Sequence, residues 1–203
     1  MDKEGRRRQL VECAKSVFAK KGYHEASIDD VIRAAGVARG TFYLHFESKR
    51  TIFREVLEEL FQRIWSSVRP ITVGADEDPR AQIVANLASL CAVLEEDEDV
   101  GRILLGGTVG LDPEAHQALA GFTESCRTRL ARALRKGQEL GIVREGDTTV
   151  LAISIMGIMK EYFTQRLLET KPPGVATFLV QVHRFFQAGW LREEKKPRRR
   201  AKA

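Results

Sequence analysis

The stretch GVARGTFYLHFESK, residues 36–49, decides how this chain folds. Gly36 and Val37 form a tight turn into a short helix predicted at about 38–44, and another short helix is predicted just before the turn, at 28–35. Helices of fewer than about ten residues are not stable alone, so neighbouring helices must hold this pair. Two short helices joined by a glycine turn and supported in this way form a helix-turn-helix.

The segments on either side supply the supporting helices. Upstream, a helix predicted at about 5–20 has its apolar residues on one stripe, namely Leu10, Ala14, Val17 and Phe18. Gly22 ends this helix, and Ser27 can cap the helix that follows. Downstream, Ser48 can cap a long fourth helix that Pro70 ends. The helix-turn-helix is therefore expected to lie between two longer helices.

The rest of the chain also has helical spacing of apolar residues, so we predict an all-α protein with about nine helices. The further helices are expected at about 80–95, 98–105, 112–141, 147–170 and 174–194. We divide the chain into a three-helix helix-turn-helix domain (1–50), a larger helical domain (51–194) and a basic tail (195–203) that we predict to be disordered.

Composition excludes several classes of protein. The 203 residues, 43% of them hydrophobic, suffice to bury a core. The first residues lack the apolar stretch of a secretory signal, and no run reaches the roughly 18 apolar residues of a membrane span, so we expect a cytoplasmic protein that does not contact a membrane. Three widely spaced cysteines predict neither a disulfide nor a zinc site, and we expect no metal and no other cofactor.

Basic charge is concentrated at the two ends of the chain. Residues 1–50 have eleven Lys and Arg against seven Asp and Glu, and residues 190–203 have seven against two. The region between them has fifteen against nineteen. A polyanion is attracted to such ends, although charge runs are more often ordinary solvated faces.

The second short helix has the residues that a helix needs in the major groove of DNA. Ala38, Gly40 and Thr41 are small, so the backbone can approach the duplex, and Arg39 can bind a guanine with its forked guanidinium. Thr41 can also contact a phosphate or a thymine methyl group. We further expect Ser27 and Lys49, each at the start of a helix, to face phosphates, because helix N-termini attract anions.

The stretch from Gln9 to Phe53, about a quarter of the chain, closely resembles the DNA-binding domain of the TetR family of bacterial regulators. The resemblance is carried by Ala14 and Phe18, Gly22, Ser27-Ile28, Ala35-Gly36-Val37, the string Gly40-Thr41-Phe42-Tyr43-Leu44-His45-Phe46, and Ser48-Lys49. The family usually has Ser or Thr where this chain has Ala38, so a cap of the recognition helix is lost here. The resemblance implies that Tyr43 and His45 bind phosphates, which fixes register without reading sequence.

The predicted DNA-binding residues are thus Ser27, Ala38, Arg39, Gly40, Thr41, Tyr43, His45 and Lys49. The alternative interpretation is that Tyr43 and His45 only pack against the protein and that Lys49 is a solvated charge. Phe42 and Phe46 are expected in the core.

One recognition helix reads only a few base pairs, so a regulator of this size gains affinity by pairing two of them on successive half-sites. The last two long helices have apolar stripes for this purpose, and the family dimerises through two helices per subunit. The predicted dimer residues are Leu151, Ile155, Ile158, Tyr162, Phe178, Val182, Phe185 and Gly189. The alternative is that these stripes are the core of one chain.

The resemblance also implies a small-molecule pocket among the central helices, whose occupation changes the separation of the two recognition helices. The candidate pocket residues are Leu87, Leu90, Arg102, Leu104, His116, Phe122, Met156, Met159 and Phe163. Their apolar character favours a hydrophobic or amphipathic effector, although each residue is individually typical of ordinary core or surface.

The sequence therefore predicts a dimeric, ligand-responsive repressor whose partners are a palindromic operator in double-stranded DNA, a small effector and a second copy of itself. An enzyme is disfavoured because the four histidines are scattered and the glycine-rich stretch 106–110 lacks the lysine of a phosphate loop. A constitutive DNA-binding protein without an effector remains the alternative.

Overall fold

The computed structural model describes residues 2–72, 78–105, 113–168 and 171–189, and within these ranges it contains nine helices and no strand. The helices are α1 (Lys3–Glu25), α2 (Ile28–Ala35), α3 (Arg39–Tyr43), α4 (Lys49–Ser66), α5 (Pro79–Glu96), α6 (Glu98–Leu105), α7 (Pro113–Glu139), α8 (Thr148–Leu167) and α9 (Val175–Gly189). The predicted all-α fold is confirmed. The basic tail at 195–203 lies outside the described residues.

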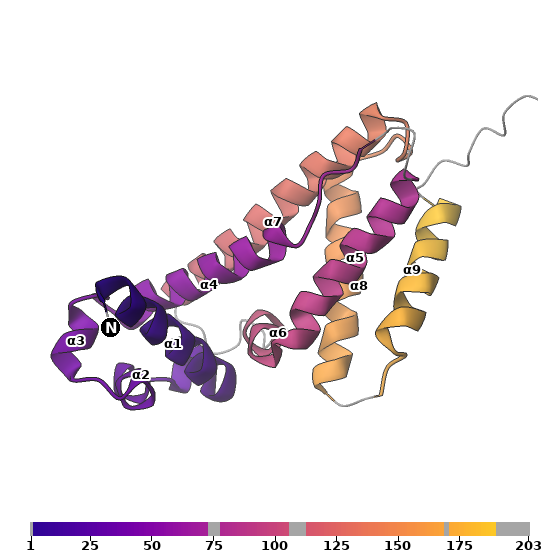
Figure 1. Ribbon diagram of the computed structural model, residues 1–203. Helices are drawn as coiled ribbons and strands as arrows, with labels where there is room; N and C mark the ends of the chain where they lie inside the picture. The colour runs from indigo at the N-terminus through magenta and orange to yellow at the C-terminus, as the bar shows by residue number, and fades with distance from the viewer. Residues whose placement is uncertain (1, 73–77, 106–112, 169–170, 190–203) are drawn as a thin grey trace, which may run out of the picture.

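The helices form an elongated molecule with two ends (Figure 1). At one end α1, α2 and α3 lie together, and at the other α5, α8 and α9 pack around shared buried residues. Helices α4 and α7 run side by side and connect the two ends, while α6 contacts both α1 and α8. Helix α4 therefore leads directly from the helix-turn-helix into the helical body.

Side-chain caps explain why the helices of the first end begin where they do. The Ser27 Oγ accepts a hydrogen bond from the Asp30 backbone N–H at 3.1 Å, and the Asp30 carboxylate accepts one from the Ser27 N–H at 3.0 Å. Ser48 and Thr51 make the same reciprocal pair at the start of α4. Such capping boxes satisfy backbone donors that a helix leaves unpaired. The predicted caps at Ser27 and Ser48 are confirmed.

The turn between α2 and α3 depends on a glycine. Gly36 has φ 63° and ψ 36°, in the left-handed region that other residues avoid, and its N–H reaches back to the carbonyls of Ile32 and Arg33. The first helix has a comparable break at Gly22, where φ is 74°, and one more helical turn follows as far as Glu25. The predicted end of this helix, near residue 20, was therefore a few residues early.

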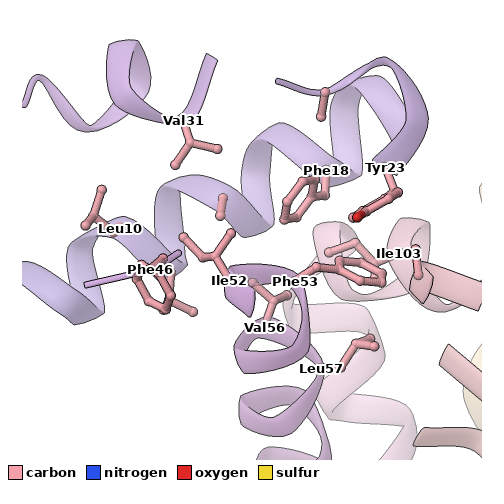
Figure 2. Packing of buried hydrophobic residues seen from close by; sticks show 14 of the residues in the cluster. Leu10, Phe18, Tyr23, Val31, Phe46, Ile52, Phe53, Val56, Leu57 and Ile103 are labelled. Carbon is pink, nitrogen blue, oxygen red and sulfur yellow. The ribbon is translucent and has the colours of Figure 1, made fainter. Parts of the chain in front are cut away.

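The largest buried cluster is continuous from the helix-turn-helix into the body (Figure 2). Phe18 of α1 packs edge-on against Phe53 of α4, with ring centroids 5.3 Å apart. Further along, Ile103 of α6 and Leu119 of α7 join the same cluster. The predicted boundary at residue 50 lies in the first turn of α4, and the hydrophobic core crosses it.

The other end of the molecule has two smaller clusters. In the first, Cys91 of α5 lies among residues of α8 and α9, and burial raises the pKa of its thiol to about 12. The Tyr162 ring stacks on Phe178 with centroids 3.8 Å apart, and its hydroxyl donates to the Pro173 carbonyl at 2.9 Å. In the second, Val143 packs with Leu151, Val182 and Phe186. These contacts fix α8 and α9 to each other within one chain.

We predict that F42A strongly destabilises the protein. Phe42 is 0% exposed, whereas the nearby Leu44 is 76% exposed. Loss of a fully buried phenylalanine costs about 3–5 kcal/mol, including the cavity that it leaves. Urea unfolding followed by circular dichroism, at fixed protein concentration, measures this. L44A is the matched control and should change the free energy of unfolding by less than about 0.5 kcal/mol. Equal effects of the two substitutions would contradict the described orientation of α3.

Candidate nucleic-acid interface

Helix α3 has one buried side and one exposed side. Phe42 is fully buried, while Arg39, Gly40, Tyr43 and the following Leu44 are exposed, Tyr43 by 45%. The expected burial of Phe42 and Phe46 is confirmed. The outer side of α3 is therefore accessible along its length.

The start of α3 lacks a side-chain cap, as the sequence predicts. Ala38 occupies the N-cap position with extended backbone and makes no side-chain hydrogen bond. The first backbone N–H groups of α3 are consequently not covered by a capping side chain. Gly40 is exposed, and a Cβ added there would meet no atom within 4 Å, so the backbone can be approached closely at this point.

Arg39 lies on the exposed side with its guanidinium held in place. Its Nη1 donates to the Asp29 Oδ1 of α2 at 3.0 Å, and its guanidinium carbon lies 5.9 Å from the centroid of the Tyr43 ring. Both partners are themselves exposed. An ion pair of this kind on the surface contributes little stability, so Arg39 can exchange Asp29 for another acceptor at small cost.

Thr41 and His45, the other two predicted contacts from this segment, are half-buried. The backbone carbonyl of His45 accepts a hydrogen bond from the Arg7 Nη1 at 3.1 Å. The Ser27 hydroxyl, also predicted to face a phosphate, is exposed but donates to the Asp30 Oδ2 at 2.8 Å. Hydrogen bonds from Lys21 and Ser27 hold the pKa of Asp30 well below its usual range.

Lys49 is placed differently from the expectation. Its ammonium points to the end of α1, where it donates to the carbonyls of Tyr23 at 2.8 Å, His24 at 3.2 Å and Ala26 at 2.9 Å. It also lies 4.3 Å from the centroid of the Tyr23 ring. An ammonium has three protons, and here each has a carbonyl acceptor. In the DNA-free chain Lys49 therefore faces the end of α1 and not outward, and its predicted phosphate contact stays a prediction.

Two residues of α1 that sequence reasoning missed support the same unit. Arg7 binds both carboxylate oxygens of Glu55 at 3.1 and 2.9 Å, and its guanidinium lies 4.5 Å from the Phe46 ring centroid. Gln9 donates to the Ala35 carbonyl, the last residue of α2, at 3.0 Å. Both residues lie next to the apolar stripe that contains Leu10. This position was the only feature of the sequence that could have indicated their supporting role.

An ion cluster joins the first helices to the body. Asp97, between α5 and α6, accepts from Lys15 of α1 at 2.9 Å and from Arg63 of α4 at 2.7 Å. Burial disfavours the charge on Lys15, but hydrogen bonds to Glu12 and Asp97 outweigh it and raise the pKa of the ammonium. This cluster ties α1 and α4 to the same point of the body.

The structure has a groove of about 560 Å³ between α4 and α7. Its lining residues are Arg50, Arg54, Leu57, Glu58, Phe61, Gln117, Ala118, Gly121, Phe122 and Ser125. Only Phe122 belongs to the predicted pocket. The groove has arginines from the first turns of α4 and aromatic rings farther along, where Phe61 and Phe122 meet edge-on at 6.2 Å.

None of the other predicted pocket residues in the described ranges lines this groove. Met159 and Phe163 are buried in the cluster around Cys91, and Leu87 and Leu90 pack against that cluster. Met156 is half-buried. Arg102 and His116 are exposed, and the side chain of Leu104 lies outside the described residues. Helical spacing identified these apolar residues, but tertiary packing uses four of them to fill the interior.

The predicted dimer residues divide into two groups. Six of them contact the buried clusters of one chain. Leu151, Tyr162 and Val182 are buried there, whereas Ile155, Ile158 and Phe178 are half-buried. Phe185 and Gly189 are exposed. The large apolar residues that α8 and α9 do expose by at least half are Val150, Ile153, Val180 and Phe185. In the single chain the stripe that periodicity detects packs largely against the chain's own core, and its predicted role in a dimer stays a prediction.

Within the described ranges, no cluster of His, Cys, Asp and Glu could hold a metal ion. None of the helices in those ranges is both long and apolar enough to cross a membrane.

Comparison with known proteins places this geometry in a family. Residues 10–56 match the family described as "Bacterial regulatory proteins, tetR family". The HTH-type transcriptional repressor DhaR of Mycobacterium sp. (strain GP1) is 30% identical over 142 residues, which cover 68% of this chain and 70% of that protein. The HTH-type transcriptional regulator YdgC of Bacillus subtilis is 26% identical over 91% of this chain and 92% of its own length.

Solved structures share the fold over nearly the whole chain. A TetR-family transcriptional regulator from Syntrophomonas wolfei superposes with a TM-score of 0.80 at 22% identity, over 93% of this chain and 97% of that one. FadR from Bacillus subtilis, solved in complex with stearoyl-CoA, has a TM-score of 0.73 at 20% identity, over 90% and 98%. The relatives are transcriptional regulators and not enzymes, as the sequence predicts. The chain belongs to the TetR family of bacterial transcriptional regulators.

Proposed function

We propose that this protein is a repressor that binds a palindromic operator as a dimer and is released from it by an amphipathic effector. The observation that carries the proposal is the two-sided α3, with Phe42 fully buried and Arg39, Gly40 and Tyr43 accessible. Only a helix whose inner side is fixed can present its outer side to a duplex in one orientation. The name of DhaR, a repressor, supports repression over activation.

In this proposal residues 1–50 bind DNA and residues 51–194 bind the effector and the second subunit. Arg39 leaves Asp29 and binds a guanine, because a base edge gives its guanidinium two hydrogen bonds in place of the single one that it makes to the exposed Asp29. Gly40 and Ala38 allow close approach of the backbone. Tyr43, exposed at the end of α3, binds a phosphate and fixes the register.

The second subunit covers the exposed faces of α8 and α9. Val150 and Ile153 on α8, and Val180 and Phe185 on α9, are each at least half exposed in the single chain. Exposed apolar side chains gathered on adjacent elements are typical of protein contacts. Gly157 supports close approach of helices, since a Cβ added there would meet no atom within 4 Å. The proposed interface therefore uses the outer faces of these helices.

The effector proposal rests on the groove between α4 and α7. Arg50 and Arg54, from the first turns of α4, line the groove together with the apolar side chains of Leu57, Phe61 and Phe122. One carboxylate, Glu58, also lines the groove and accepts from Gln62 at 2.8 Å. Two cations against one anion, beside aromatic rings, favour an anionic amphiphile. The structural neighbour that binds stearoyl-CoA supports a ligand of this class.

A ligand in this groove would act directly on the DNA-binding end. Helix α4 begins at Lys49, six residues after the last residue of α3, and its first turns are packed into the core of the helix-turn-helix. A change in the separation of α4 and α7 must therefore carry α3 with it. In a dimer, that movement alters the distance between the two recognition helices, and the operator selects one distance.

We predict that R39A weakens binding to the operator selected from a random DNA pool. Loss of a bidentate base contact costs about 1–3 kcal/mol, which corresponds to roughly 5- to 150-fold in affinity. Fluorescence anisotropy with labelled operator measures the change. R132A removes an exposed arginine of α7 and is the matched control, with affinity unchanged. Equal affinities for R39A and the wild type would remove Arg39 from the interface.

We predict that F185D converts the dimer to a monomer, because a buried carboxylate without a partner strongly opposes association. Phe185 is 60% exposed in the single chain, so the monomer should keep its helical content. Sedimentation velocity measures the oligomeric state. L44D, which places the same charge at another exposed apolar residue, at the opposite end of the molecule, should remain dimeric. A dimeric F185D would place the interface elsewhere.

We predict that G121L blocks the groove. A Cβ added at Gly121 would meet no atom within 4 Å, so the larger side chain fits without strain and occupies the space of the ligand. Calorimetric titration with stearoyl-CoA should show at least tenfold weaker binding to this variant. G121A, which leaves most of the space, is the control and should bind normally. Unchanged binding to G121L would place the effector elsewhere, and no binding to the wild type would favour the constitutive alternative.

A further inference from the structure

The backbone carbonyl groups at the C-terminal end of α1 are hydrogen-bonded by a side chain from another helix. The regular helix is interrupted at Gly22, whose φ is 74°, and after one more turn the backbone becomes extended at Ala26. The last carbonyls of a helix have no partner within the helix, and they require a donor from elsewhere. Here the carbonyls of Tyr23, His24 and Ala26 all accept from the same atom, the Nζ of Lys49.

The Lys49 ammonium is fully used by this arrangement. Its three carbonyl acceptors lie at 2.8, 3.2 and 2.9 Å, and the Tyr23 ring lies under the charge at 4.3 Å. Hydrogen bonds from a charged donor are stronger than neutral ones, and a cation at the C-terminus of a helix also interacts favourably with the helix dipole. To bind a phosphate, Lys49 would have to give up at least one of these hydrogen bonds.

The position of this contact in the chain gives it a role. Ala26 directly precedes Ser27, the N-cap of α2, and Lys49 directly follows Ser48, the N-cap of α4. One side chain therefore ties together the two points at which the chain enters and leaves the helix-turn-helix. Resting on the DNA-binding role proposed above, we propose that Lys49 is a positioning residue that sets the angle of α3 relative to α4, and that it does not bind a DNA phosphate.

The other helix ends of this unit are held in the same manner, which supports the inference. Gln9 donates to the carbonyl of Ala35 at the end of α2, and Arg7 donates to that of His45 just after α3. At the C-terminal end of each of the first three helices, a backbone carbonyl thus accepts a hydrogen bond from a side chain of another helix. Lys49 completes this set, and the helix-turn-helix is fixed at all its C-terminal ends.

Salt dependence separates a positioning role from a phosphate contact. The slope of log affinity against log salt concentration is negative, and each phosphate contact that is lost reduces its magnitude by about 0.9. A residue that only positions the helix lowers affinity and leaves that slope unchanged. The test compares K49M, which keeps an unbranched side chain over the Tyr23 ring but has no charge, with wild type on a random-sequence 30-base-pair duplex at several salt concentrations.

For K49M we expect a slope equal to that of wild type, a lower melting temperature and at least tenfold faster amide hydrogen exchange at Ala26 and Asp30. Both amides are hydrogen-bonded in the turn that Lys49 holds. R39M is the positive control for a lost phosphate or base contact and should exchange normally at these amides. A slope whose magnitude is smaller by about 0.9 per subunit in K49M, with normal exchange, would overturn the proposal.

K49R keeps the inference testable if K49M does not fold. Arg keeps the positive charge and binds phosphate well, but its planar fork does not match three carbonyls arranged around one ammonium. We expect K49R to keep the slope and to show the faster exchange at Ala26 and Asp30. Wild-type exchange in K49R would overturn the proposal. Absence of salt-dependent DNA binding by the wild type would contradict the proposed function, while melting and exchange would still report on Lys49.

Discussion

The structure depends on the burial of α4 in a single core that extends from the recognition unit into the body. Phe53 contacts the rings of Phe18 and Tyr23 at 5.3 and 4.7 Å, and Leu60 lies in the same cluster as Leu119 of α7. Close-packed protein interiors do not deform continuously, so a displacement of α4 at one end of the molecule is transmitted to the other end. The continuity of this core, more than any single contact, makes a distant effect on α3 physically possible.

Polar contacts refine what the core determines. The carbonyl ends of α1, α2 and α3 are each bound by a side chain of another helix, so the recognition unit is held as one body. Asp97 then binds Lys15 and Arg63, whose side chains are on α1 and α4, at the junction of α5 and α6. The recognition unit thus has a rigid interior, and it is attached to the body both by this ion cluster and by the continuous core, so it moves together with α4.

Local signals in the sequence predicted the helices well. Caps such as Ser27 and Ser48 and the left-handed Gly36 act within a few residues, and the observed bounds of α2 agree with the predicted 28–35. Contacts across the chain could not be predicted in this way. Periodicity places Tyr162 and Val182 on apolar stripes, but it does not show that the stripes of α8 and α9 pack against each other. Likewise, nothing near Lys49 in the sequence indicates that its ammonium binds carbonyls more than twenty residues away.

The exposed apolar residues of α8 and α9 have a consequence for the life of the protein in a cell. A newly made chain folds its own clusters but still displays Ile153, Val180 and Phe185 to water. Exposed apolar side chains on neighbouring helices favour association, so the concentration of the chain decides how much of this surface stays in contact with water.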